Sequence, residues 1–297
     1  SGQKIFITWG DHDMTDNIIH LVLARTPGSP EGTRGISLFI VPKFLVNEDG
    51  SLGARNDAKC VSLEHKLGIH GSPTCVMAYG DEGHCVGHLL GEEHKGMAAM
   101  FTMMNNARLN VGIQGVAGAE RAWQMAADYA KDRRQGVAIG ASAPGPSAII
   151  EHADVRRMLM TIKSTTEAAR AITMLNAKAI DLGEHHPDKV LREKYKALAD
   201  LLTPLSKAYG SDMGVENASL ALQIHGGMGF IEETGIAQIY RDTRINPIYE
   251  GTNGIQAMDL VGRKLSMAGG KYWRVFLGEI EAFGMSLPDS EEFASLK

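Results

Sequence analysis

The chain has 297 residues, of which 44% are hydrophobic and 22% are charged, and its formal net charge is -5. This balance is typical of a globular protein with a sizeable core and argues against wholesale disorder. A negatively charged chain offers no broad basic surface to a nucleic acid. No apolar run approaches the roughly 18 residues that a membrane-spanning helix needs.

Residues 1–92 are predicted to form a β domain. Short β-branched runs at 4–8, 18–25 and 36–42 are separated by polar or Pro/Gly-rich turns. Runs of this length and spacing favour a barrel or a sandwich. The chain starts at Ser1 without an initiator Met and enters a strand-like run at once, which indicates the middle of a longer protein.

The cysteines number 3, at Cys60, Cys75 and Cys85. An odd number without zinc-like spacing favours reduced thiols over disulfides or a metal site. We therefore expect a cytoplasmic protein and no metal. The segments Glu184-His185-His186 and Glu92-Glu93-His94 lack a third ligand at metal spacing, so solvated turns are the favoured interpretation.

From residue 93 onwards the pattern becomes helical. Apolar residues between Met97 and Met104 recur at the spacing of one buried helix face, and we predict a long helix at about 95–134. This helix contains Gly112, Gly115 and Gly118, each of which costs a lone helix about 1 kcal/mol. The glycines therefore predict that another helix packs closely against it.

Three further helices are predicted. A linker at 136–147 precedes a helix at 150–182, and the next runs over 187–224 with Pro204 as a candidate kink. A Gly-rich break at 226–229 ends it, and the last helix is predicted at 252–267. Long helices joined by short breaks favour an antiparallel four-helix bundle. The fold class is thus α+β and multi-domain, with a β-barrel or sandwich followed by a four-helix bundle.

The residues best suited to chemistry lie between 223 and 256. A Gly-rich break after a long helix lets a ligand approach exposed backbone N–H groups. Glu250 precedes Gly251 and Thr252, and Thr252 suits the N-cap of a new helix, whose free N–H groups favour a phosphate or an oxyanion. A carboxylate at such a junction is positioned as a general base needs to be. The alternative is a simple helix cap followed by a solvated turn, and the pattern alone leaves both open.

Several segments in order resemble the acyl-CoA dehydrogenase family. Tyr-Glu-Gly-Thr-Asn-Gly-Ile-Gln at 249–256 is similar to its catalytic signature, and Gln-Ile-His-Gly-Gly-Met-Gly-Phe at 223–230 to its flavin-binding segment. Residues 2–8 resemble the strand that backs the flavin ring. Residues 105–108 fall where the family usually carries Asp-x-x-Arg, and 132–135 resemble the motif that ends that helix.

The resemblance extends over nearly the whole chain. It implies a partial middle β domain at 1–92, a C-terminal bundle at 93–268 and the start of a C-terminal extension at 269–297. The insertion at 137–147 and the tail resemble the larger bacterial members, of the 3-methylmercaptopropionyl-CoA dehydrogenase-like group. An ordinary tail helix packed on the bundle is the alternative for the extension.

The resemblance implies FAD-dependent α,β-dehydrogenation of an acyl-CoA thioester to a trans-2-enoyl-CoA. Glu250 would remove the α-proton while a hydride passes to flavin N5, and the Glu250 N–H would polarise the thioester carbonyl. The substrate-binding residues would be Asn105, Arg108 and Gly251. The cofactor-binding residues would be Phe6, Thr8, Arg133, Gln223, Gly226, Gly227, Thr252 and Gly254.

The resemblance also implies partners. Arg133 would reach the FAD of a neighbouring subunit, so a homodimer or homotetramer is expected, and an electron-transferring flavoprotein is the expected electron acceptor. Ala107 stands where some members carry their base, which leaves Glu250 as the candidate of the two. Asn105 replaces the usual Asp and removes a charge.

Two alternatives to the dehydrogenase stay open. One is an acyl-CoA oxidase that passes electrons to oxygen, and the other is a flavin-free, inactive fragment or scaffold of such an enzyme. The family's N-terminal helical domain is missing from the sequence, which leads us to expect weak FAD binding, or none, by the chain itself.

Overall fold

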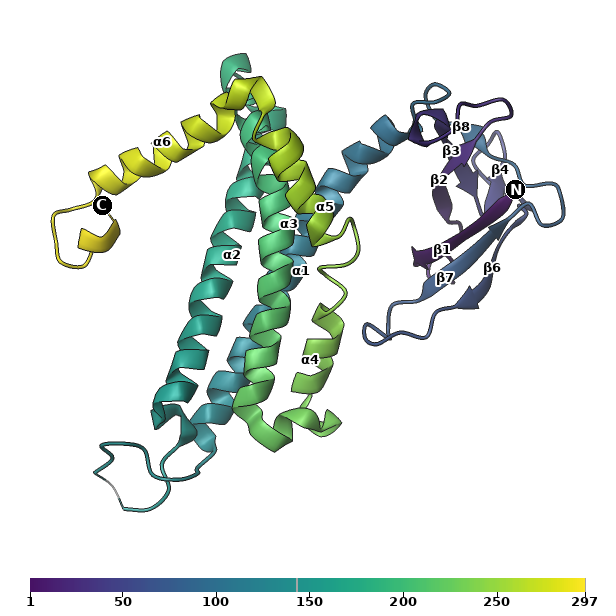
Figure 1. The fold of residues 1–297 in the computed structure, drawn as a ribbon. Helices are drawn as coiled ribbons and strands as arrows, with labels where there is room; N and C mark the ends of the chain where they lie inside the picture. The colour runs from purple at the N-terminus through teal and green to yellow at the C-terminus, as the bar shows by residue number, and fades with distance from the viewer. Residues whose placement is uncertain (143, 297) are drawn as a thin grey trace. The chain divides into compact units, whose positions relative to one another are not determined.

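The computed structural model describes residues 1–142 and 144–296, and the chain divides into two compact units, Ser1–Met104 and Asn105–Lys297. The described part is mostly helical, with a few small antiparallel sheets (Figure 1). Helix α1 (Gly96–Asp132) begins in the first unit and continues into the second, close to the predicted range of 95–134. None of the helices in the described ranges has the length and hydropathy of a membrane span.

The first unit contains short antiparallel strands in separate sheets. One sheet has the order β1-β7-β6, from β1 (Gly2–Thr8), β7 (Thr74–Tyr79) and β6 (Ala58–Leu63). A second has the order β2-β3-β8, from β2 (Ile19–Arg25), β3 (Ile36–Pro42) and β8 (His88–Leu89). The third pairs β4 (Phe44–Val46) with β5 (Leu52–Arg55). The predicted strands at 4–8, 18–25 and 36–42 are confirmed, whereas the sequence did not separate β4 to β8.

The core of the first unit lies between these strands because their inward-facing residues are apolar. Its buried members are Val22, Val41, Ala58, Cys75, Met77 and Tyr79. The cysteines Cys60, Cys75 and Cys85 are free thiols. A turn of 3₁₀ helix, Thr33–Gly35, precedes β3.

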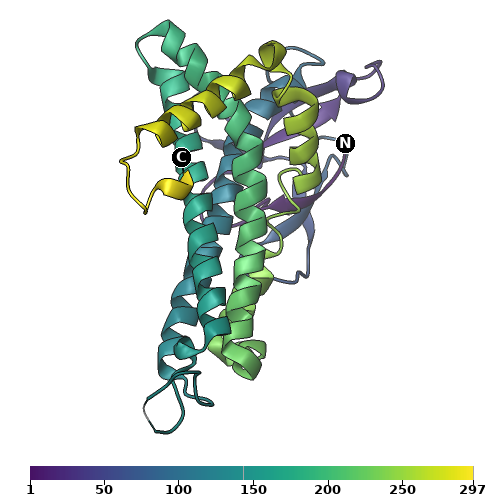
Figure 2. The ribbon, with the colours of Figure 1, turned by 60° about the vertical axis from the view of Figure 1, so that its left-hand side comes forward.

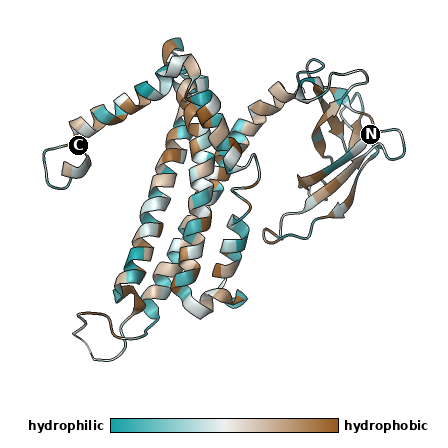
Figure 3. Ribbon diagram, viewed as in Figure 1, coloured by the Kyte–Doolittle hydropathy of each residue, from teal (hydrophilic) through white to brown (hydrophobic). Residues whose placement is uncertain are grey.

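The second unit is built on three long helices, which lie side by side in Figures 1 and 2. After α1 come α2 (Ala153–His185), preceded by a 3₁₀ turn at Ile149–Glu151, and α3 (Lys189–His225). Residues 186–188 join α2 to α3, so these two helices run antiparallel. Hydrophilic and hydrophobic residues alternate along the helices in Figure 3, as helices with one buried face require. The buried side chains between them include Ala122, Ala126, Ile162, Ala218, Ala221 and Ile224.

Glycines bring α1 and α3 into backbone contact. A Cβ atom built on Gly115 would lie 2.0 Å from the carbonyl oxygen of Gly210, and one built on Gly210 would lie 2.7 Å from the carbonyl oxygen of Gly112. Neither position has room for a methyl group. The close helix packing predicted from the glycines of α1 is therefore confirmed.

The linker between α1 and α2 is a loop closed at its base. Arg134 pairs with Ala148, and the Gln135 N–H donates to the Ser147 carbonyl at 3.0 Å. The predicted insertion at 137–147 falls in this loop, and its residue 143 lies outside the described residues.

Short helical elements follow α3. They are 3₁₀ turns at Gly226–Phe230 and Glu232–Thr234, α4 (Ile236–Thr243), α5 (Asn253–Asp259), a π turn at Leu260–Lys264, a 3₁₀ turn at Met267–Gly270, α6 (Lys271–Ser286) and a 3₁₀ turn at Ala294–Leu296. The prediction of one helix over 252–267 was wrong in extent, because the π turn replaces the α-helical pattern after Asp259. The backbone then turns left-handed at Ala268 (φ 49°) and Gly269 (φ 64°), which ends the helical run. α4 was not predicted, and Pro204 lies inside α3.

Candidate active site

Glu250 lies in a loop that is closed at its base. The Asn253 N–H donates to the Pro247 carbonyl at 3.0 Å, which brings the two ends of the loop together. Within it Glu250 has a φ of 55° and Gly251 a φ of 85°, both left-handed. The Glu250 side chain is exposed. The loop therefore presents a carboxylate outwards on a backbone conformation that is rare for a residue with a Cβ atom.

The backbone after Glu250 is fixed by a helix cap and by a buried amide. Thr252 Oγ1 accepts a hydrogen bond from the Ile255 N–H at 3.3 Å, so the predicted N-cap of α5 is confirmed. Gln256 is fully buried, and its Nε2 donates to the Gly251 carbonyl at 3.2 Å. A Cβ atom on Gly251 would lie 2.8 Å from this nitrogen, so the packing as well as the φ angle favours glycine there.

Arg108 of α1 lies beneath the same loop. Its side chain is 4% exposed, and its Nη1 is 3.4 Å from the Asp259 carboxylate of α5. Its Nη2 is 3.7 Å from a Cβ atom built at Gly251. Asn105 lies one turn earlier on α1 and is exposed. The structure thus brings Arg108 and Gly251 together, with Asn105 on the neighbouring turn.

Polar groups of α3 also reach the loop. Lys207 is fully buried, and its Nζ donates to Asn253 Oδ1 at 2.9 Å. Burial lowers the pKa of Lys207 to about 8, against the opposing influence of the Asp212 carboxylate. Tyr249, beside Glu250, donates its hydroxyl to Gln114 Oε1 of α1, and burial raises the pKa of Tyr249.

The Gly-rich segment lies at the far end of α3. Gly226 ends the helix with a φ of 59°, and Cβ atoms built on Gly226 or Gly227 would meet open space. Gln223 is exposed one turn earlier. Lys207 and His225 are five helical turns apart on α3, which is roughly 27 Å. The Gly-rich segment and the Glu250 loop are therefore two separate surfaces of the second unit.

Arg133 shares the end of the helices that carries the Gly-rich segment. It follows the last residue of α1 and is exposed. Its N–H donates to the Tyr129 carbonyl at 2.9 Å, and the Tyr129 ring stacks on the His225 ring with a centroid distance of 4.4 Å. The structure thus places Arg133 with Gln223, Gly226 and Gly227, and not with Glu250.

In the first unit, a bulge in β1 exposes an aromatic ring. The pairing of β1 with β7 shifts register between Lys4 and Ile7, and Phe6 within this stretch has a φ of 58°. The Phe6 side chain is 68% exposed, and Thr8 is also exposed. Bulges commonly redirect a side chain beside a binding site, and β1, an edge strand of its sheet, leaves both Phe6 and Thr8 exposed.

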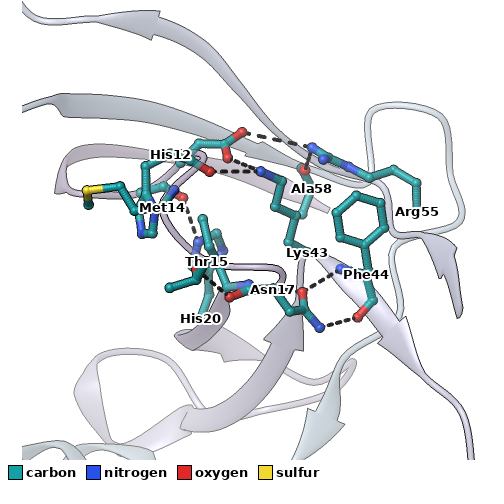
Figure 4. A network of polar contacts seen from close by, with 12 residues as sticks. His12, Met14, Thr15, Asn17, His20, Lys43, Phe44, Arg55 and Ala58 are labelled. Atoms are coloured by element: carbon teal, nitrogen blue, oxygen red, sulfur yellow. Dashed lines mark hydrogen bonds and ion pairs between the residues drawn. The ribbon is translucent and has the colours of Figure 1, made fainter. Parts of the chain in front are cut away.

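The loop after β1 is held by a polar network, drawn in Figure 4. Lys43 Nζ donates to the Asp11 carboxylate at 2.6 Å and to the His12 carbonyl at 3.2 Å. The Asn17 amide both donates to the Phe44 carbonyl at 2.8 Å and accepts from the Phe44 N–H at 2.9 Å. This network fixes the chain immediately after the residues that β1 exposes.

Comparison with known proteins decides the family. The family model for the C-terminal domain of acyl-CoA dehydrogenase matches residues 94–265, which include Arg108, the Gly-rich segment and the Glu250 loop. The chain belongs to the acyl-CoA dehydrogenase family. The resemblance drawn from the sequence motifs is confirmed at this level.

Individual relatives extend the similarity into the first unit. The 3-methylmercaptopropionyl-CoA dehydrogenase of Ruegeria pomeroyi is 54% identical over 282 residues, covering 95% of this chain and 47% of that protein. A butyryl-CoA dehydrogenase of Syntrophomonas wolfei is 45% identical, covering 99% of this chain and 49% of that protein. The solved butyryl-CoA dehydrogenase of Megasphaera elsdenii aligns with a TM-score of 0.67 at 28% identity, covering 89% of this chain and 59% of that one.

The chain spans about half the length of the curated relatives it matches, 47% of the first and 49% of the second. The sequence motifs did not single out Lys207 or Gln114, whereas Gln256 closes the motif at 249–256 but was given no role of its own. No local pattern marks Lys207 as functional, because a lysine in a long helix is ordinarily assigned to the solvated face.

Proposed function

We propose that the complete protein is an FAD-dependent acyl-CoA dehydrogenase in which Glu250 is the base that removes the α-proton of the thioester. The observation that carries this proposal is the Glu250 loop. Its carboxylate is exposed, its ends are joined by the bond from Asn253 to Pro247, and the capped helix α5 follows it. A general base needs this combination of access and fixed direction.

The residues of the chain fit a flavin dinucleotide. In the first unit, β1 presents the exposed Phe6 ring beside Thr8, which suits contact with a flat aromatic system. In the second unit, the open backbone at Gly226 and Gly227 lies near Arg133, which suits a pyrophosphate. The proposed cofactor-binding set is completed by Gln223 on that surface, and by Thr252 and Gly254 on the separate surface of the Glu250 loop. When bound, FAD supplies the acceptor for the hydride that leaves the β-carbon.

The side chains of the chain supply the proton chemistry and the orientation. Glu250 accepts the α-proton, and its own N–H donates to the thioester carbonyl oxygen, where negative charge develops. Arg108 is buried beneath the loop and adds positive charge to this region. Asn105 and Gly251 complete the proposed substrate-binding set.

The proposed substrate is an acyl-CoA thioester. By its name, the 54% identical relative acts on 3-methylmercaptopropionyl-CoA, which makes this thioester the first to test, with butyryl-CoA second.

We further propose an electron-transferring flavoprotein as the electron acceptor and a cytoplasmic homodimer or homotetramer, in which the exposed Arg133 reaches a neighbouring subunit. In the complete protein, residues 1–92 form part of the middle β-barrel or sandwich domain. Residues 93–268 form the four-helix bundle, and residues 269–297 begin a C-terminal extension.

The test uses the visible absorption spectrum of the purified complete protein and of Glu250→Gln. Anaerobic addition of the acyl-CoA panel is expected to bleach the flavin band of the wild type. Glu250→Gln is expected to keep its flavin and to lose bleaching, because the amide cannot accept the α-proton. Fast bleaching in Glu250→Gln would refute the base assignment. Reoxidation by air at the turnover rate would identify an oxidase instead.

A further inference from the structure

Lys207 is a buried cation with no role in the mechanism described so far. It is fully buried on α3, a helix that contacts α5 and whose Ser206 and Gly210 lie against α1. Lysine is almost never fully buried unless it is paired, because its ammonium loses water there. Its burial therefore requires a hydrogen-bond partner that offsets part of the lost hydration.

That partner is Asn253, the first residue of α5. Asn253 Oδ1 accepts from Lys207 Nζ at 2.9 Å and from Ser211 Oγ at 3.2 Å. Its Nδ2 donates to the Asp212 carboxylate at 2.7 Å. Both ends of one amide are thus bound to a single stretch of α3.

The same residue closes the loop that carries the base. The Asn253 N–H donates to the Pro247 carbonyl, so the loop from 247 to 253 is fastened to α3 at its closing point. Glu250 is in the middle of this loop. A displacement of Asn253 would move the Glu250 carboxylate, and a misplacement of about 1 Å can cost roughly 100-fold in rate.

The charges around Lys207 come from three elements. Asp212 lies on the same helix, Arg108 on α1, and Glu250 on the loop before α5. The Arg108 guanidinium and burial disfavour the ammonium, whereas the carboxylates of Asp212 and Glu250 favour it, and the balance lowers the pKa of Lys207 to about 8. The carboxylates of Asp212 and Glu250 therefore offset part of the effect of burial on Lys207.

We propose that Lys207 is a positioning residue for Glu250, because it fixes the loop of the base through Asn253. This inference rests on the proposed function of Glu250. The buried ammonium opposes folding below pH 8, and this penalty is relieved as the pH rises from about 8 towards 10.5, because the lysine of the unfolded chain still holds its proton there. Lys207 thus lowers the stability of the folded chain at neutral pH. A residue with a purely structural role would not be expected to do so.

The experiment compares Lys207→Met and Lys207→Gln in the flavin-loaded complete protein. Lys207→Met removes the charge and the donor, whereas Lys207→Gln removes the charge and keeps an N–H donor. We expect flavin reduction by acyl-CoA to slow about tenfold or more in Lys207→Met and less in Lys207→Gln. The wild type is expected to lose rate above pH 8, where Lys207 loses its proton, and both variants should lack this loss.

Stability is the second readout, and it does not depend on activity. At pH 7 the unfolding midpoint of Lys207→Met should be no lower than that of the wild type, because the burial penalty is gone and Ser211 still donates to Asn253. The backbone amides of residues 248–255 should nevertheless exchange faster with solvent. The matched control is Lys264→Met, which removes another buried lysine, bonded to Asp200 at 3.1 Å, and should leave the pH–rate profile unchanged.

Each outcome decides the inference. Wild-type rates and pH profiles in both Lys207 variants overturn it, and so does a loss of stability without a change in the profile. If Lys207→Met does not fold, Lys207→Gln and Asn253→Ala decide it, since the rate losses of these two changes should be less than additive in the double variant. Retained flavin reduction in Glu250→Gln would instead refute the proposed function, and the two failures are thereby distinguished.

Discussion

The contact between α1 and α3 leaves no room for a methyl group at Gly115, and the cost of Gly115→Ala can be worked out from the structure. The new Cβ atom would lie 2.0 Å from the Gly210 carbonyl oxygen and 2.9 Å from Ser211 Cα, whereas real Cβ contacts essentially never fall under 3.0 Å. The helices must therefore separate by about 1 Å, because the atoms in the way belong to the backbone and cannot rotate aside.

Overpacking of a core typically costs about 1–3 kcal/mol, and a clash with backbone belongs at the upper end of that range. Alanine regains about 1 kcal/mol over glycine through its higher helix propensity. The net loss is then about 2 kcal/mol, which corresponds to a fall in melting temperature of about 4–8 °C for a domain of this size.

The assay is thermal unfolding of the purified chain, followed by far-ultraviolet circular dichroism. The matched control is Gly278→Ala on α6, where a Cβ atom would meet nothing within 4 Å. This variant keeps the gain in helix propensity without the clash, so its melting temperature should be equal to that of the wild type or slightly higher. Equal melting temperatures for Gly115→Ala and Gly278→Ala would refute the reasoning, because the helices would then separate without cost.

Two further predictions concern helix caps. Thr252→Ala should destabilise the start of α5 by about 1 kcal/mol, seen as faster amide exchange at Ile255, whose N–H loses its acceptor; unchanged exchange would contradict the cap. Asp188 caps α3, and the N–H groups of Leu191 and Val190 hold the pKa of its carboxyl below its ordinary value of 3.8. Its stabilisation is therefore complete above pH 3.8 and is lost as the pH falls through the folded-state value. The melting temperature of Asp188→Ala should lie below that of the wild type at pH 7 and approach it at pH 3, and a gap independent of pH would refute this account.

Local sequence signals were sufficient for the long helices. The apolar spacing after residue 95 predicted α1, and the glycines of that helix predicted a closely packed helix partner, since only such a partner offsets their poor helix propensity. The structure identifies this partner as α3. Short elements gave no such signal. β7 is buried on nearly all its residues and shows no alternation, and α4, with 8 residues, is too short for its periodicity to stand out.

The residues of the site likewise fall into those that local sequence predicted and those that depend on long-range contacts. Thr252 was identified from its residue type and position because a cap depends on neighbours in sequence. The bond between Lys207 and Asn253 joins residues that are 46 positions apart, and no local pattern specifies it. A lysine in a long helix is ordinarily assigned to the solvated face, and only the helix packing shows that this one is inside.

The left-handed backbone at Glu250 has a consequence for engineering. Glycine adopts a φ of 55° without the penalty of about 1–2 kcal/mol that a residue with a Cβ atom meets there. A library screened only for heat resistance would therefore enrich glycine at this position and discard the proposed base. Any thermostable variant of this protein should be sequenced at residue 250 before its melting temperature is counted as an improvement.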